Sequence, residues 1–270
     1  MEPIEVIVLS AHEQAHCRLR ETGEAVICRA SRPWELIPGE IAMIRPRKRW
    51  RFGARQYLSG DVVGWRLDVV ALNVTPLRLE RRFDWDPAEE YWGEDDEPLP
   101  DWAVPIVERG PRPAFEMEQV LPGVDWNDVD DDPIVEAADL AATGHPADAI
   151  VILMDLLHQD LRCLDAHAHL GNIAFRYGAA DALRHYDVGV QIGELTLGPH
   201  FSGVLPWGCI DNRPFLRCLH GYGLCLWRLG RSADALGVFQ RLLCLNPSDN
   251  QGIRFLLPEV HAGRPCRDRD

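Results

Sequence analysis

Residues 216–249 constrain the fold of this chain more than any other stretch, because their apolar residues recur at the spacing of two short helices. Asn212 is a predicted N-cap, and Pro214 suits the first turn of the helix that follows. Gly230 predicts the end of this first helix, and Pro247 predicts the end of the second. A chain with such a stretch is predicted to be a helical scaffold that binds a partner.

This stretch resembles a tetratricopeptide repeat, a helix–turn–helix unit of about 34 residues. The residues that carry the resemblance are Leu219, Tyr222, Gly223, Leu226, Ala235, Phe239 and Pro247. Gly223 and Ala235 are small enough to let the two helices approach closely, and Phe239 is expected to fill the space between them. The match is not strict, because Leu219 and Leu226 stand where the family pattern has Trp and Tyr.

Weaker copies of the pattern lie upstream. One runs through Leu170, Gly171, Ala174, Gly178, Ala182 and Tyr186, and an earlier one through Ala137, Leu140, Gly144, Ala149 and Leu153. Gly144 and Gly178 are 34 residues apart, which is the family period, whereas 52 residues separate Gly178 from Gly230. We therefore expect about three helical pairs over residues 133–262, closed by a capping helix at 249–257, and then a polar tail over 263–270. A generic helical hairpin domain is the alternative.

Stacked repeats of this kind form a curved surface whose concave face is lined by the first helix of each pair. The resemblance places these residues on that face: Asn172, Phe175, Arg176, Arg217, His220, Trp227 and Arg228. Their polar groups would bind a carboxylate, and their rings would hold apolar side chains. We expect a non-catalytic adaptor that binds a protein or peptide partner, in particular one with an acidic terminus. Ordinary surface and packing roles are the alternative.

Residues 1–82 contain short β-rich runs separated by turns. Strands are expected at 5–9, 41–45, 57–63 and 77–79, and 17–28 is expected to be a hairpin that turns at Thr22 and Gly23. That register places Cys17 opposite Cys28, either as a disulfide or as two thiols. The chain is thus predicted to be α+β, with a small SH3-like or OB-like barrel ahead of the helical domain.

The densest positive stretch of the chain lies among these strands and is expected to form a loop. It contains Arg45, Arg47, Lys48, Arg49, Trp50, Arg51, Phe52 and Arg55. Cations that follow phosphates, together with rings that stack on bases, can bind single-stranded nucleic acid. Nucleic-acid binding, with the helical domain recruiting a partner, is therefore the alternative function. A solvated loop, or a loop that binds the acidic segment after it, would also explain the pattern.

Residues 83–132 are predicted to be a linker, because they contain 17 Asp and Glu residues and many prolines. Their aromatic residues predict that the linker docks on a folded surface in an extended form. Residues 1–82 hold 14 basic and 10 acidic residues, whereas the remainder holds 14 and 32. The linker could therefore cover the basic loop. The Asp-rich run at 128–132 lacks the spacing of a calcium-binding loop.

Composition and motifs bound the remaining function classes. No apolar run is long enough for a membrane span, and the N-terminus does not resemble a signal peptide. Lysine occurs only at Lys48, which we attribute to genome composition, and we expect a bacterial, cytoplasmic protein. Cys and His cluster around 163–169 and 218–225, but do not supply four converging zinc ligands. Nucleophile and phosphate-loop motifs are absent, so we expect no metal, no cofactor and no catalysis.

Overall fold

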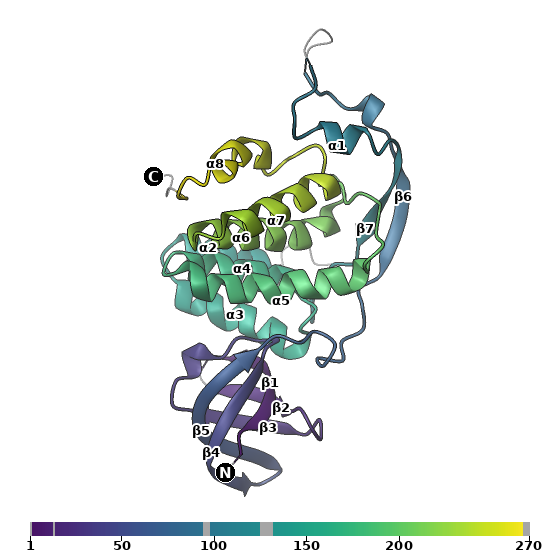
Figure 1. The fold of residues 1–270 in the computed structure, drawn as a ribbon. Coiled ribbons are helices and arrows are strands. Elements are labelled where there is room, and N and C mark those ends of the chain that lie inside the picture. Colours follow the sequence, from purple (N-terminus) through teal and green to yellow (C-terminus); the bar gives the residue numbers. More distant parts are fainter. Residues whose placement is uncertain (1, 13, 94–97, 125–131, 267–270) are drawn as a thin grey trace.

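The computed structural model describes residues 2–12, 14–93, 98–124 and 132–266. Figure 1 shows a small β-barrel at one end of the molecule, a stack of helices next to it, and a sheet of β6 and β7 along the side of the stack. The chain is therefore α+β, with a barrel followed by a helical region, as the sequence predicts.

The barrel strands are β1 (Ile4–Ala11), β2 (Ala15–Leu19), β3 (Ala25–Ala30), β4 (Ile41–Phe52) and β5 (Arg55–Arg66), and a short 3-10 helix, η1 (Pro33–Glu35), connects β3 to β4. They close in the order β1-β2-β3-β5-β4, because β4 also pairs with β1. β3 and β5 run parallel, whereas the other neighbouring strands are antiparallel. Alternate side chains point inward, so Val8, Cys17 and Leu58 share the barrel core.

The β2–β3 hairpin forms, but its predicted register is wrong by two residues. Cys17 lies opposite Val26, and Cys28 lies opposite Ala15. The turn closes earlier than predicted, because the Leu19 amide donates to the Glu24 carbonyl while Gly23, at φ 74°, completes the turn. Both cysteines still face the barrel core, where they are free thiols.

The sequence analysis predicted that the basic stretch forms a loop, and this prediction is wrong. β4 and β5 pair as far as Phe52 and Arg55, which leaves only Gly53 and Ala54 in the turn. Gly53 adopts φ 59°, which such a tight turn requires. A strand pair tolerates this run of charges because side chains near its tip reach solvent on both faces. The hairpin projects from the barrel, since β1 pairs with β4 only over residues 41–44 and β3 pairs with β5 only over 57–60.

The helices are α2 (Pro133–Ala142), α3 (Pro146–Gln159), α4 (Leu164–Phe175), α5 (Ala179–Leu197), α6 (Arg213–Arg228), α7 (Ser232–Leu245) and α8 (Leu257–His261). α2 packs on α3, α4 on α5, and α6 on α7 (Figure 1). Shorter 3-10 helices, η3 (Ile210–Asn212) and η4 (Ile253–Phe255), precede α6 and α8. None of the helices in the described part of the chain has the length and apolar character that a membrane span needs.

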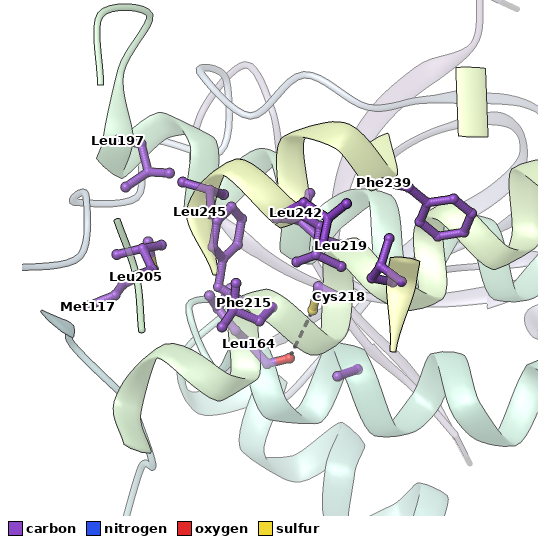
Figure 2. Packing of buried hydrophobic residues seen from close by; sticks show 14 of the residues in the cluster. Met117, Leu164, Leu197, Leu205, Phe215, Cys218, Leu219, Phe239, Leu242 and Leu245 are labelled. Atoms are coloured by element: carbon purple, nitrogen blue, oxygen red, sulfur yellow. Dashed lines mark hydrogen bonds between the residues drawn. The ribbon is translucent and has the colours of Figure 1, made fainter. Parts of the chain in front are cut away.

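Small residues set the spacing of these helices. A Cβ added to Gly223 would lie 2.5 Å from the Phe239 ring, so α6 and α7 approach as closely as the sequence suggests. The ring of Tyr186 from α5 lies between Gly171 and Gly221, where an added Cβ would lie 2.6 and 2.2 Å from it. Figure 2 shows the resulting apolar core, with the thiol of Cys218 donating to the Leu164 carbonyl at 3.4 Å.

Asn212 precedes α6 as predicted, but its side chain does not cap the helix. Its Oδ1 accepts from the backbone amide of Met117, while its Nδ2 donates to the carbonyls of Phe115 and Pro206. The buried amide is thus used to join the segment before α6 to a strand that lies about a hundred residues earlier in the chain.

The acidic segment contains ordered elements: β6 (Leu79–Trp85), η2 (Pro87–Glu89), α1 (Val104–Val107) and β7 (Arg112–Met117). β6 pairs with β7, so the strand predicted at 77–79 does not belong to the barrel. Trp85, Ile106 and Met117 are buried in the same cluster as Phe215 of α6. This part therefore packs on the helical stack, with β6 and β7 along its side and α1 at the end away from the barrel (Figure 1). Residues 128–131 of the Asp-rich run lie outside the described residues, whereas Asp132 caps α2.

The barrel is joined to the helices by a buried ion pair. Arg184 of α5 donates to both carboxylate oxygens of Glu40, and the two side chains are 9% and 3% exposed. The same guanidinium donates to the Glu35 carbonyl at 2.8 Å and lies 4.1 Å from the ring centroid of Trp65. Ile41 of β4 also belongs to the apolar cluster of α2, α3 and α4, so the core continues from the barrel into the helices.

Candidate functional site

Adjoining cavities lie beside α4 and α6, the first helices of the second and third pairs. The larger has a volume of about 970 Å³ and the smaller about 210 Å³. Both are lined by Phe175, His220, Leu224 and Gln251, so they form one continuous depression, which we term the helical groove. The sequence pattern had placed a binding face on these same helices.

The C-terminal part of the chain forms the opposite wall of the helical groove. Phe255, Leu256, Glu259 and residues 264–266 line it there. The indole Nε1 of Trp227 donates to the Arg264 carbonyl at 2.6 Å, which holds this segment against the end of α6. The Arg264 side chain also pairs with Glu259 of α8 at 2.7 Å. Side chains from α6 and from the chain's own C-terminal segment therefore enclose the groove.

The seven predicted peptide-binding residues divide into two groups. Those that line the helical groove are Asn172, Phe175, Arg217, His220 and Trp227. Arg176 and Arg228 are not in its lining. Arg176 donates to the Ala141 carbonyl at 3.4 Å, and the Arg228 guanidinium lies 4.7 Å from the ring centroid of Phe175.

The polar groups that the sequence suggested for carboxylate binding already have partners within the chain. Arg217 Nη1 lies 2.8 Å from Asp165 Oδ1, and Asp165 is only 3% exposed. The other oxygen of this carboxylate accepts from Gln119 at 3.1 Å. Asn172 Oδ1 accepts from the Tyr186 hydroxyl at 2.7 Å. The charge of Arg217 is therefore largely neutralised by Asp165.

Gln251 and His220 form a polar pair in the lining of the helical groove. Gln251 Nε2 donates to the Leu216 carbonyl at 3.2 Å and lies 3.3 Å from His220 Nδ1. Because an amide nitrogen only donates, His220 accepts at Nδ1 and carries its proton on Nε2. Burial lowers the pKa of His220 to about 4, so the imidazole is neutral at pH 7. The buried Oε1 of Gln251 has no hydrogen-bond partner within the described ranges.

Sequence reasoning did not identify Gln251. The sequence predicts a capping helix over residues 249–257, whereas the chain forms a turn there, followed by η4 and α8. Asp249 fixes this turn: its carboxylate accepts from the amides of Ile253 and Arg254 at 2.6 and 3.0 Å. A polar residue next to a predicted cap was the available signal, but its position over α6 depends on tertiary packing.

The β4–β5 hairpin is the second candidate site, and strand alternation divides its predicted residues between two faces. Arg49 lies opposite Leu58, which is fully buried in the barrel, so Arg49 and Arg51 point toward the open end of the barrel. There they line a hollow of about 1180 Å³ together with several glutamates, among them Glu21 and Glu24. On this inner face Arg49 and Arg51 thus lie near glutamates, although no ion pair joins either of them to a carboxylate within the described residues.

The outer face of the hairpin carries the other predicted residues. These are Arg45, Arg47, Lys48, Trp50, Phe52 and Arg55. Arg47 is paired with Asp61 at 2.7 Å, but no carboxylate of the described chain pairs with Arg45, Lys48 or Arg55. This face is therefore positively charged.

Aromatic rings on the outer face lie among its cations. Trp50 stacks on Tyr57 with ring centroids 5.2 Å apart, and Arg29 lies 5.7 and 5.6 Å from these two centroids. Lys48 lies 5.6 Å from the Trp50 centroid. Phe52, at the tip, is 77% exposed, so its ring is available for stacking.

The Cys and His clusters seen in the sequence are buried. Burial raises the pKa of Cys163 to about 12 and lowers that of His167 to about 4, so at neutral pH neither group is charged. Across the described residues, no three His, Cys, Asp or Glu side chains are grouped so that they could hold a metal ion.

No protein-family model, curated protein or solved structure matches this chain. The helical groove and the outer face of the hairpin are thus the two candidate binding sites.

Proposed function

We propose that the chain is a non-catalytic adaptor whose helical groove binds an extended, largely apolar peptide segment of a partner protein. The continuous depression of about 970 and 210 Å³ beside α4 and α6 carries this proposal. Apolar side chains, including Phe175, Leu224 and Trp227, dominate its lining, and a few polar groups accompany them. Cavities of this size and composition between helices are typical ligand sites.

The arrangement of helical pairs supports a tetratricopeptide-like scaffold. In such a scaffold the first helix of each pair lines the peptide-binding face, which here corresponds to α4 and α6. We favour an apolar peptide over one with an acidic terminus, because Asp165 already neutralises Arg217. The buried thiols of Cys163, Cys218 and Cys225 fit a reducing compartment, and we place the adaptor in the cytoplasm.

Peptide selection tests this function. Peptides from a random phage-displayed library are selected on the full chain and then titrated into two matched variants. Leu224→Trp fills the point where the two cavities join, whereas Leu229→Trp makes the same change at a residue of the α6 C-terminus that is 42% exposed. We expect Leu224→Trp to weaken binding by about tenfold or more, which corresponds to about 1.4 kcal/mol, and Leu229→Trp to have little effect. Failure to select any peptide, or equal binding by both variants, would refute the proposal.

A second candidate function, binding of single-stranded nucleic acid, is favoured by the outer face of the hairpin. There Lys48 and Arg55 accompany the Trp50–Tyr57 stack without carboxylate partners in the part of the chain that the structure describes. The closed strand order with β3 parallel to β5 leads us to assign the barrel to the OB-like rather than the SH3-like kind. OB folds bind oligonucleotides with strands 2 and 3 and with the β4–β5 connection.

Matched charge changes on the two faces test this second function. The affinity of labelled oligothymidylate is measured by fluorescence anisotropy over a salt series, for Lys48→Gln/Arg55→Gln and for Arg49→Gln/Arg51→Gln. We expect the outer-face variant to reduce the slope of log K against log salt by about 1.4, as for two lost phosphate contacts, and the inner-face variant to change it less. No binding by the wild-type chain, or equal slopes for both variants, would exclude this role.

A further inference from the structure

The pair formed by Gln251 and His220 defines what kind of group the helical groove binds. Gln251 offers a buried acceptor, Oε1, that no residue of the described chain uses. His220 offers a donor, Nε2–H, because Gln251 Nε2 donates to its other nitrogen at 3.3 Å. No described residue bonds to Nε2 of His220. The groove lining thus contains an acceptor and a donor on neighbouring side chains.

Both side chains are held in place before any ligand binds. Gln251 is fixed by its bond to the Leu216 carbonyl and by the turn that Asp249 stabilises. His220 packs edge-on against the buried ring of Phe239, with centroids 6.5 Å apart, and its tautomer is set by Gln251. A buried acceptor without a partner destabilises the free chain, so a ligand that reaches it and donates to it gains that interaction.

An extended peptide supplies the matching pair of groups. The N–H and C=O of one residue in an extended chain point to the same side, as they do toward a neighbouring β-strand. We infer that Gln251 Oε1 accepts the N–H, and that His220 Nε2 donates to the C=O, of one residue of an extended peptide. An apolar side chain next to that residue would contact Phe175 and Leu224, which line both cavities. This inference rests on the proposed peptide-binding function of the groove.

The test compares two small probes on the full chain. One is N-acetyl-phenylalanine methylamide, which has the N–H and C=O of one residue and an aromatic side chain. The other is its depsi analogue, O-acetyl-phenyllactic acid methylamide, in which an ester oxygen replaces that N–H. Affinities come from millimolar NMR titrations followed at the Trp227 indole and the Gln251 side-chain amide. The wild-type chain should bind the amide about three- to tenfold more tightly than the ester.

Protein variants assign the difference to atoms. Gln251→Met has a side chain of similar length without the acceptor, so the preference for the amide should disappear. His220→Phe keeps Gln251 bonded to Leu216 and should weaken both probes while retaining the preference. Equal affinity of the two probes for the wild-type chain would overturn the inference but would still support the proposed groove function. This comparison needs no variant. A preference that persists in Gln251→Met would also overturn it. If neither probe binds, the proposed groove function itself fails.

Discussion

The packing of α6 against α7 can be tested with two glycine substitutions that differ only in their surroundings. A Cβ added to Gly223 would lie 2.5, 2.9 and 3.1 Å from ring atoms of Phe239. Phe239 is fully buried, so its ring cannot simply turn out into solvent. Gly237 is exposed on α7, and an added Cβ there would meet no atom within 4 Å. Gly223→Ala and Gly237→Ala therefore introduce the same methyl group in a crowded and in an open position.

The expected magnitudes follow from helix propensity and packing. Replacing Gly by Ala inside a helix stabilises it by about 1 kcal/mol, so Gly237→Ala should raise the free energy of unfolding by about that amount. Gly223→Ala has the same gain but overpacks the interface, which costs about 1–3 kcal/mol. Gly223→Ala should therefore be about 1–3 kcal/mol less stable than Gly237→Ala.

Urea unfolding monitored by circular dichroism measures both variants. The double variant Gly223→Ala/Phe239→Leu provides the control, because the smaller Leu side chain should relieve the clash. Its loss in the free energy of unfolding should therefore be smaller than the sum of the losses in the two single variants. If Gly223→Ala is as stable as Gly237→Ala, then α6 and α7 do not approach as closely as the contact between Gly223 and Phe239 implies.

Two further predictions concern buried charges. Arg184→Met should lower the free energy of unfolding by about 3–5 kcal/mol, because it leaves Glu40 buried without its cation, and Arg184→Met/Glu40→Met should cost much less. The loss of stability in Arg184→Met should shrink as the pH falls, because burial already raises the pKa of Glu40 and the protonated side chain needs no cation. Urea midpoints whose difference from wild type does not change with pH would contradict this. Burial lowers the pKa of His185 to about 3, whereas histidine in the unfolded chain titrates near 6.5, so the wild type loses stability as the pH falls between these values. His185→Phe removes this loss, so the free energy of unfolding of the variant relative to wild type should rise by about 2 kcal/mol between pH 7 and pH 5. Urea titrations at the two pH values measure this difference in stability, and the same difference at both pH values would refute the prediction.

Local patterns predicted the elements whose signals lie within a short stretch. Gly230 and Pro247 marked the ends of α6 and α7, and the small size of Gly223 indicated where they approach. The β4–β5 hairpin was missed as a strand pair because its charge density outweighed its alternating pattern. Its strands form nonetheless, since near the tip neither face needs to be buried.

Features that depend on distant residues could not be predicted. β6 pairs with β7 although an acidic, proline-rich segment separates them in the sequence, and the sequence of neither strand indicates which strand it pairs with. Arg217 was expected to be available to a ligand, but α4 brings Asp165 to it from 52 residues away. The wall of the helical groove beyond α6 comes from residues after Asp249, whose position over α6 is set by packing rather than by local sequence.

The most direct test of peptide binding in the helical groove is one spectrum of the chain with its nine tryptophans labelled with ¹⁵N. Trp227 lines the groove and Trp50 lies on the outer face of the hairpin, so their indole signals report the two candidate sites separately. Adding a selected peptide should shift the Trp227 signal and leave the Trp50 signal in place. A peptide that binds while Trp227 stays unchanged would show that the helical groove is not its site.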